Sequence, residues 1–129
     1  YHPESKQKNI EKLKKLFKKI RKAYPDTILV VNRGFEVLPE LGPYIDGVLA
    51  ENVYTEYDFE KKVSYIKPAE EYQTVIDQLT GLRKKYHIHL FSLDYWNPED
   101  KEGIEKIRKF YELRGISPSI STIELDRLL

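Results

Sequence analysis

The amino-acid sequence predicts an α/β protein with a parallel sheet, and three observations support this fold class. Helical and strand-like segments alternate along the 129 residues, in the order α-β-α-β-α-β-α-β-α. The strand-like segments are short, apolar and bounded by turn residues, which suits the buried strands of a parallel sheet. Polar residues follow these segments, whereas turn residues precede them. The alternation of helices and strands indicates right-handed crossovers. The polar residues that follow the strands predict one functional face at the carboxyl ends of the strands.

The expected helices are recognised by apolar side chains spaced three and four residues apart. They are predicted at residues 4–23, over a short stretch at 37–41, after Pro68, after the acidic sequence 97–100, and from residue 122 onward. Tyr24-Pro25 should end the first helix, because the residue before a proline is pushed out of the α region. Gly42-Pro43 should end the short helix, and Gly115 should stop the one that begins after residues 97–100.

Four strands are predicted, at residues 27–31, 47–51, 87–93 and 116–121. The segment between Glu51 and Pro68 is expected to be a polar and aromatic loop. Four βα units could form half of a (β/α)8 barrel or a small open doubly wound sheet. The sequence contains no glycine-rich phosphate loop, so nothing supports a nucleotide-binding form of the open sheet. We expect residues 1–129 to be a single half-barrel segment.

Half a barrel would leave two unpaired strand edges, which soluble proteins normally avoid. The chain has no methionine and begins with Tyr1, so we expect it to be a processed product or a fragment. The edges should therefore be covered by an N-terminal half barrel, which we favour, or by a second copy of the same chain.

The composition excludes several classes of partner and cofactor. There are 22 Lys and Arg residues against 21 Asp and Glu residues, so the net charge of +1 gives no reason to expect nucleic acid or a membrane surface as partner. The basic run at 14–22 has apolar residues at helical spacing and is expected to be a solvated helix face. The absence of cysteine excludes disulfides and thiolate metal sites. His87 and His89 make a poor metal site without further ligands, so no metal or cofactor is expected.

Two carboxylates, Glu51 and Asp94, end consecutive predicted strands and are the candidate catalytic residues. Neighbouring strands lie about 4.8 Å apart, so two inward carboxylates could be about 5 to 9 Å apart, which spans the separations found in glycosidases. One would protonate the leaving oxygen, and the other would attack or activate water. Alternatively, one or both are structural, capping a helix or pairing with Arg33 or Lys67.

Aromatic side chains gather near the same predicted face, namely Tyr54, Tyr57, Tyr95 and Trp96. Aromatic rings stack on the apolar faces of sugars while Asn, Asp and Arg side chains bond the hydroxyl groups, so this mixture favours a carbohydrate cleft. The alternative for any single ring is ordinary packing of loops onto the barrel. Ser92 and the later serines have no suitably placed histidine, which argues against a Ser-His-Asp hydrolase.

Four motifs lie at strand ends in the order VVNRGFE, YIDGVLAENVYT, LFSLDYW and GISPSISTIELDRL. Together they resemble glycoside hydrolase family 114, which includes endo-α-1,4-polygalactosaminidases, over about residues 26–128. The resemblance implies a (β/α)8 barrel of which this chain supplies strands five to eight. It also implies an amino-sugar-containing polysaccharide as substrate, and a location outside the cell or in the cell envelope.

The resemblance maps a catalytic glutamate onto Glu51, while the second catalytic acid, an upstream aspartate, is not in this chain. We therefore expect the segment alone to be inactive. Asp94 and Tyr95 match the motif of strand seven, where substrate contacts or pKa tuning are expected. The full set of predicted substrate-binding residues is Asn32, Arg33, Asn52, Tyr54, Tyr95, Trp96 and Ser121. The alternatives are a non-catalytic carbohydrate-binding or scaffold barrel, and a half barrel that associates with itself.

Overall fold

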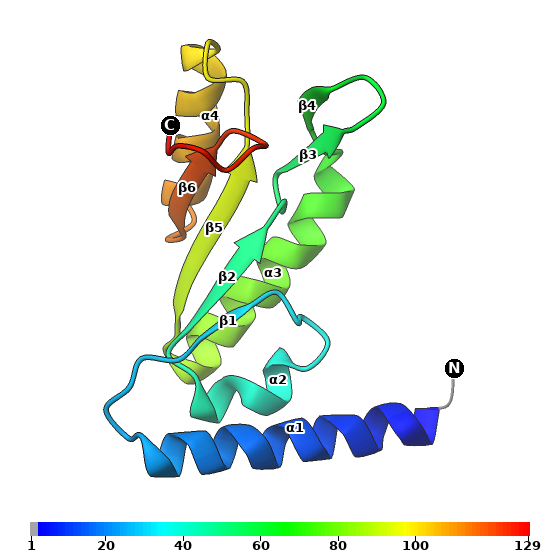
Figure 1. Cartoon of the computed structure of the whole chain (residues 1–129), viewed down its shortest axis with the longest axis vertical. Helices are drawn as coiled ribbons and strands as arrows, with labels where there is room; N and C mark the ends of the chain where they lie inside the picture. Colours follow the sequence, from blue (N-terminus) through cyan, green and yellow to red (C-terminus); the bar gives the residue numbers. More distant parts are fainter. Residues whose placement is uncertain (1–2) are drawn as a thin grey trace.

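A computed structural model describes residues 3–129 and shows one four-stranded parallel sheet with helices packed against it (Figure 1). The elements in chain order are α1 (Pro3–Ala23), β1 (Val30–Asn32), α2 (Leu38–Leu41), a 3-10 turn η1 (Gly42–Tyr44), β2 (Gly47–Glu51), β3 (Thr55–Asp58), β4 (Val63–Ile66), α3 (Ala69–Tyr86), β5 (His89–Tyr95), α4 (Lys101–Glu112) and β6 (Ser117–Ser121). The strand order is β1-β2-β5-β6, and β3 and β4 form a separate antiparallel hairpin. The predicted α/β class and parallel sheet are confirmed.

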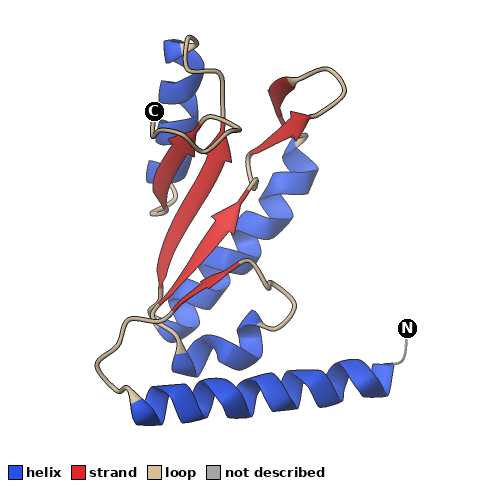
Figure 2. Cartoon of the chain, in the orientation of Figure 1, coloured by secondary structure: helices blue, strands red, loops and turns tan. Residues whose placement is uncertain are grey.

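The two faces of the sheet differ because side chains alternate along each strand. On one face, Val48, Ala50 and Leu90 are buried in a core that also contains Leu79 of α3 and Ile107 of α4. The helices α3 and α4 cover this face, and α1 lies against α2 and η1 at one end of the molecule (Figure 2). The core therefore lies between the sheet and these two helices, and Leu38 and Leu41 of α2 extend it.

The opposite face of the sheet carries apolar side chains that remain open to solvent. Val30 is 48% exposed and Phe91 is 37% exposed, and Leu49 and Leu93 beside them are half-buried. The strands β1 and β6 form the two edges of this sheet. We call this surface, made by Val30, Leu49, Phe91 and Leu93, the inner face, because it lies opposite the helices.

The helix boundaries follow local signals that the sequence contains. Asp100 caps α4 by accepting a hydrogen bond from the backbone N–H of Gly103, and α3 starts directly after Pro68. Gly115 has a φ of 69°, a left-handed conformation that glycine adopts without strain and that follows the end of α4. These predicted helices are confirmed. None of the helices in residues 3–129 has the length and hydrophobicity needed to cross a lipid bilayer.

Two local predictions were wrong. The segment expected to be a loop after Glu51 contains the hairpin of β3 and β4, in which Thr55 pairs with Ile66. Residues 122–129 do not begin a helix; Leu128 forms an isolated bridge with Ser121, so the segment folds back along β6. By contrast, the predicted end of the short helix is confirmed: α2 ends at Leu41 with Gly42 as its C-cap, and the chain then continues into the 3-10 turn η1.

The strand limits also differ from those expected. The first strand starts at Val30 rather than residue 27, and it includes Asn32. The third predicted strand starts at His89 and runs on through Tyr95, so Asp94 and Tyr95 are strand residues. Because strand residues alternate between faces, this extension decides which way the two side chains point.

Candidate functional site

Glu51 lies at the carboxyl end of β2 and is contacted by side chains from both neighbouring strands. Asn32 at the end of β1 donates a hydrogen bond from Nδ2 to Glu51 Oε1 at 2.9 Å. Tyr95 at the end of β5 donates from its hydroxyl to Glu51 Oε2 at 3.4 Å. Both carboxylate oxygens are therefore oriented by donors, and the three strands bring together three residues that the sequence assigned to the site.

The surroundings of Tyr95 disfavour ionisation of its hydroxyl. Burial raises the pKa of Tyr95, and the carboxylate of Glu51 raises it further, while the positive charge of Arg33 acts in the opposite direction. A protonated phenol remains a hydrogen-bond donor to Glu51 at neutral pH. Arg33 itself is exposed and has a φ of 62°, and its backbone N–H bonds the carbonyl of Leu49. Its positive charge acts on Tyr95, which bonds Glu51.

Asp94 does not point toward Glu51. The Cα of Glu51 pairs with that of Leu93, so Asp94, one residue further along β5, points to the opposite face of the sheet. Asp94 is 0% exposed on the helix-covered side. The expectation that both carboxylates point inward was therefore wrong. The sequence-based alternative of a structural carboxylate fits this position, although the partners are Thr55 and Tyr111 rather than Arg33 or Lys67.

Tyr54 is also placed in the core rather than in a cleft. It is 6% exposed, and its ring stacks on Phe110 with ring centroids 3.6 Å apart and an interplanar angle of 2°. Tyr72 packs edge-on against the same ring. Since its ring is packed in the core, Tyr54 exposes too little surface for a sugar to stack on.

Two further predicted binding residues have most of their polar groups engaged within the chain. Ser121 is 2% exposed, and its hydroxyl donates to the backbone carbonyl of Arg127 at 2.7 Å. Asn52 adopts a φ of 53°, its N–H bonds the carbonyl of Leu93, and its carbonyl accepts from Lys67 Nζ at 2.6 Å. The side-chain oxygen of Asn52 is buried without a hydrogen-bond partner in the described part of the chain.

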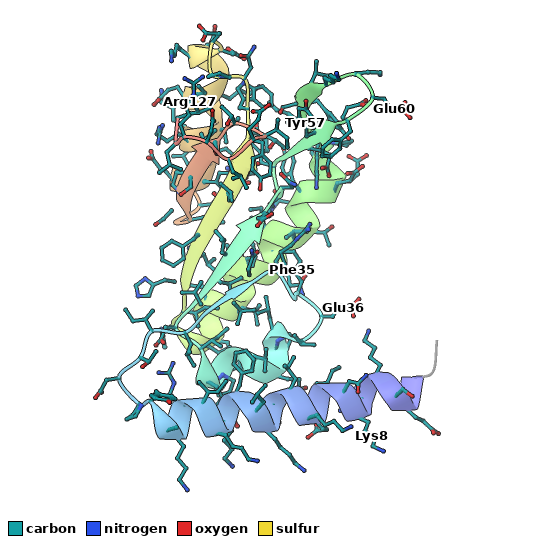
Figure 3. All side chains as sticks on the ribbon, in the orientation of Figure 1. Lys8, Phe35, Glu36, Tyr57, Glu60 and Arg127 are labelled. Atoms are coloured by element: carbon teal, nitrogen blue, oxygen red, sulfur yellow. The ribbon has the colours of Figure 1, made fainter. Side chains whose placement is uncertain are left out.

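Trp96 lines a hollow of about 460 Å³ between the β3–β4 hairpin and the C-terminal segment. Its indole N–H donates to Asp100 Oδ2 at 2.9 Å, which fixes the ring at the start of α4. Tyr57 comes from the hairpin and Arg127 from the C-terminal segment (Figure 3). The remaining lining residues are Lys62, Val63, Ser64, Asn97, Pro98, Thr122, Ile123, Glu124 and Asp126. We call this the Trp96 hollow. Its lining combines two aromatic rings with positively and negatively charged side chains that can donate or accept hydrogen bonds.

The residues that sequence reasoning missed are Thr55 and Tyr111, which hold Asp94. Tyr111 lies on the buried face of α4 beside Ile107 and Phe110, where the sequence pattern indicates packing rather than a polar contact. A signal for the hairpin was present, since Thr55 to Asp58 and Val63 to Ile66 flank a charged turn, but neither segment is uniformly apolar. Within residues 3–129 there is no group of three or more His, Asp and Glu side chains that could hold a metal ion.

The fold and the site together define a class of protein: an α/β half barrel with a carboxylate at the carboxyl end of an inner strand. No family model and no curated protein matches the chain. Two solved structures do: the glycoside hydrolase domain of PelA from Pseudomonas aeruginosa, and a glutamate-to-alanine variant of that domain. The first is 24% identical with a TM-score of 0.81, and the second is 23% identical with a TM-score of 0.80.

These similarities cover 99% of this chain and 51% of each PelA chain. The chain thus spans about half the length of the domain that it matches. At this identity the likeness establishes the fold, which is that of half a glycoside hydrolase barrel domain. The predicted half barrel is confirmed, whereas the resemblance to family 114 remains a prediction.

Proposed function

We propose that this chain is the Glu51-bearing half of a glycoside hydrolase that cleaves an amino-sugar-containing polysaccharide when an N-terminal half barrel completes it. The observation that carries the proposal is the position of Glu51 at the carboxyl end of β2, with both oxygens held by Asn32 and Tyr95. Catalytic residues of parallel barrels occur at this end of the strands. The likeness to a glycoside hydrolase domain supports this reaction class.

Glycosidic cleavage requires two carboxyl groups on opposite sides of the scissile bond. Glu51 supplies one of them and acts as the general acid that protonates the leaving oxygen. Asp94 does not supply the other, because it is buried on the opposite face of the sheet. The second carboxylate therefore comes from the complementary half barrel, in agreement with the upstream aspartate that the family resemblance implies.

The inner face supplies the surface on which the complementary half would pack. Val30 and Phe91 are exposed there, and β1 has one free side in the sheet. The outer side of β6 is free except at Ile120 and Ser121, onto which Leu128 and Leu129 fold back. Four further parallel strands would cover these apolar side chains and pair with both edges, which closes the barrel. The fraction of the PelA domain that the chain covers, 51%, is consistent with a missing half.

The Trp96 hollow supports a carbohydrate ligand. Trp96 and Tyr57 offer ring faces for sugar stacking, and Glu124, Asp126 and Arg127 offer groups that bond hydroxyl and ammonium substituents. An amino-sugar polymer carries both kinds of substituent. From the family resemblance we further propose a location outside the cell or in the cell envelope, with a polysaccharide rather than nucleic acid or a membrane as partner.

The test is the substitution Glu51→Gln in the full polypeptide, with partially N-acetylated α-1,4-polygalactosamine as substrate. Release of reducing ends should stop, while the thermal unfolding curve should remain that of the unmodified protein. Glu112→Gln makes the same chemical change at an exposed position near the end of α4, so it should hydrolyse normally. Undiminished hydrolysis by Glu51→Gln would refute the role of Glu51.

A non-catalytic carbohydrate-binding barrel is the second candidate, and the Trp96 hollow favours it, because the hollow needs no second carboxylate. In that case the full polypeptide binds oligosaccharides saturably in a calorimetric titration and releases no reducing ends. A third candidate, self-association of two half barrels, rests on the exposed inner face. Light scattering would show a dimer of this chain, with the two copies covering each other's inner faces.

A further inference from the structure

We propose that Asp94 is a positioning residue, which holds the turn that follows Glu51 and so fixes the direction of the Glu51 side chain. The inference rests on the proposed function of Glu51 and adds a role for a residue on the other face of the sheet. We call residues 52–55 the Glu51 turn, since they connect Glu51 at the end of β2 to the start of β3.

Asp94 binds the last residue of this turn twice. Its Oδ2 accepts from the backbone N–H of Thr55 at 2.9 Å and from the Thr55 hydroxyl at 2.7 Å. Both residues are 0% exposed, so water does not compete for these bonds. A buried hydrogen bond to a carboxylate is among the stronger polar contacts in proteins. The end of the Glu51 turn is thereby attached to β5.

Asp94 also holds the turn through α4. Its Oδ1 accepts from the Tyr111 hydroxyl at 2.5 Å, and the Tyr111 oxygen in turn accepts from the backbone N–H of Tyr54 at 3.0 Å. Tyr111 is 0% exposed. Consecutive N–H groups of the Glu51 turn, those of Tyr54 and Thr55, are thus bound by one connected group of buried side chains.

The Glu51 turn needs such an attachment because its backbone is not regular. Asn52 has a φ of 53°, in the left-handed region that non-glycine residues adopt infrequently. Lys67 supplies two further bonds, from Nζ to the carbonyl of Asn52 and from its N–H to the carbonyl of Tyr54. A strained conformation of this kind persists only where the surrounding contacts determine it.

The same strand controls Glu51 from both faces of the sheet. Tyr95 on the inner face bonds the carboxylate of Glu51, and Asp94, its neighbour on β5, bonds the turn behind it. A carboxylate is required at position 94, because three donors converge on it and an amide would present its own donors to one of them. The net effect of the surroundings is to raise the pKa of Asp94. Burial raises it, and the bonds from Tyr111 and Thr55 and the charge of Lys67 offset only part of this effect.

The test compares Asp94→Asn and Thr55→Val with two matched controls on α3, Asp77→Asn and Thr80→Val, all in the full polypeptide. Loss of positioning should lower kcat for polysaccharide hydrolysis by about tenfold or more, while KM changes by less than about threefold. The controls should leave both constants unchanged. If Asp94→Asn does not fold, Thr55→Val decides the question, because it removes one bond from the same carboxylate and keeps the side-chain shape.

Hydrogen exchange of the Glu51 turn supplies a second measurement that does not require hydrolysis. The amides of Tyr54 and Thr55 should exchange about tenfold faster or more in Asp94→Asn, and at the unchanged rate in Asp77→Asn. Unchanged exchange in the folded variant, or unchanged kcat despite faster exchange, would overturn the proposal. If the unmodified protein hydrolyses no polysaccharide, the proposed function fails, while the exchange rates still decide whether Asp94 holds the turn.

Discussion

Asp94 and Tyr95 are consecutive residues of β5, yet they hold Glu51 from opposite faces of the sheet. Tyr95 bonds the Glu51 carboxylate on the inner face, and Asp94 bonds Thr55 behind the sheet. The alternation of side chains along a strand produces this division. Tyr95 therefore contacts the candidate site directly, whereas Asp94 supports it through Thr55.

Buried tyrosines should make the protein sensitive to alkaline pH. Burial raises the pKa of Tyr54, Tyr95 and Tyr111 above the usual value of 10.0, and nearby ionisable groups, Tyr72, Glu51 and Asp94 respectively, raise it further. Above pH 10.0 the unfolded chain loses these protons while the folded chain keeps them, so stability is full below this pH and falls as pH rises further.

The measurement is an ultraviolet titration of phenolate formation alongside thermal unfolding at several alkaline pH values. Tyr54, Tyr95 and Tyr111 should ionise only at pH values above 10.0, and their ionisation should accompany unfolding. Ionisation of all tyrosines in one step near the usual pKa, with the fold intact, would contradict this prediction.

Phe110→Ala should destabilise the protein strongly. Phe110 is 8% exposed, stacks on Tyr54 and packs against Tyr72, and the guanidinium of Arg114 lies 3.8 Å from its ring centroid. Replacing a buried phenylalanine by alanine costs about 3–5 kcal/mol. Denaturant unfolding should show a loss of this size, whereas Leu113→Ala, at a position 84% exposed, should show almost none.

Phe91→Lys should block closure of the barrel without unfolding this half. Phe91 is 37% exposed on the inner face, so a lysine there can remain solvated in the isolated segment but would be buried under a complementary half barrel. Hydrolysis by the full polypeptide should be lost while the circular dichroism of this 129-residue chain is unchanged. Leu113→Lys is the control, and equal losses in both variants would argue against an inner-face contact.

The single tryptophan, Trp96, should report ligand binding to the Trp96 hollow. Oligosaccharides of galactosamine should change its fluorescence with a saturable dependence on concentration, because the sugar displaces water from the indole. Tyr57→Ala removes the ring on the hairpin side of the hollow and should weaken binding by about fivefold or more. Tyr24→Ala, at a residue 63% exposed, should leave the affinity unchanged.

Much of the fold could be read from local patterns. The spacing of apolar residues predicted the long helices, and Asp100 and Gly115 marked the limits of α4. The hairpin of β3 and β4 was missed because its strands are half-exposed and carry few apolar residues. The C-terminal segment was wrongly expected to be helical, since its bridge to Ser121 depends on a strand that lies beside it only after folding.

The sequence by itself determined the order of the four parallel strands and of the helices between them, and the position of Glu51 where a buried strand ends. Those features follow from local propensity and from hydrophobic patterns along the chain. Only the tertiary structure decided that Asn32 and Tyr95 meet Glu51, and that Asp94 supports it from the opposite face. The physical reason is strand register, because a shift of one residue turns every side chain to the other face of the sheet.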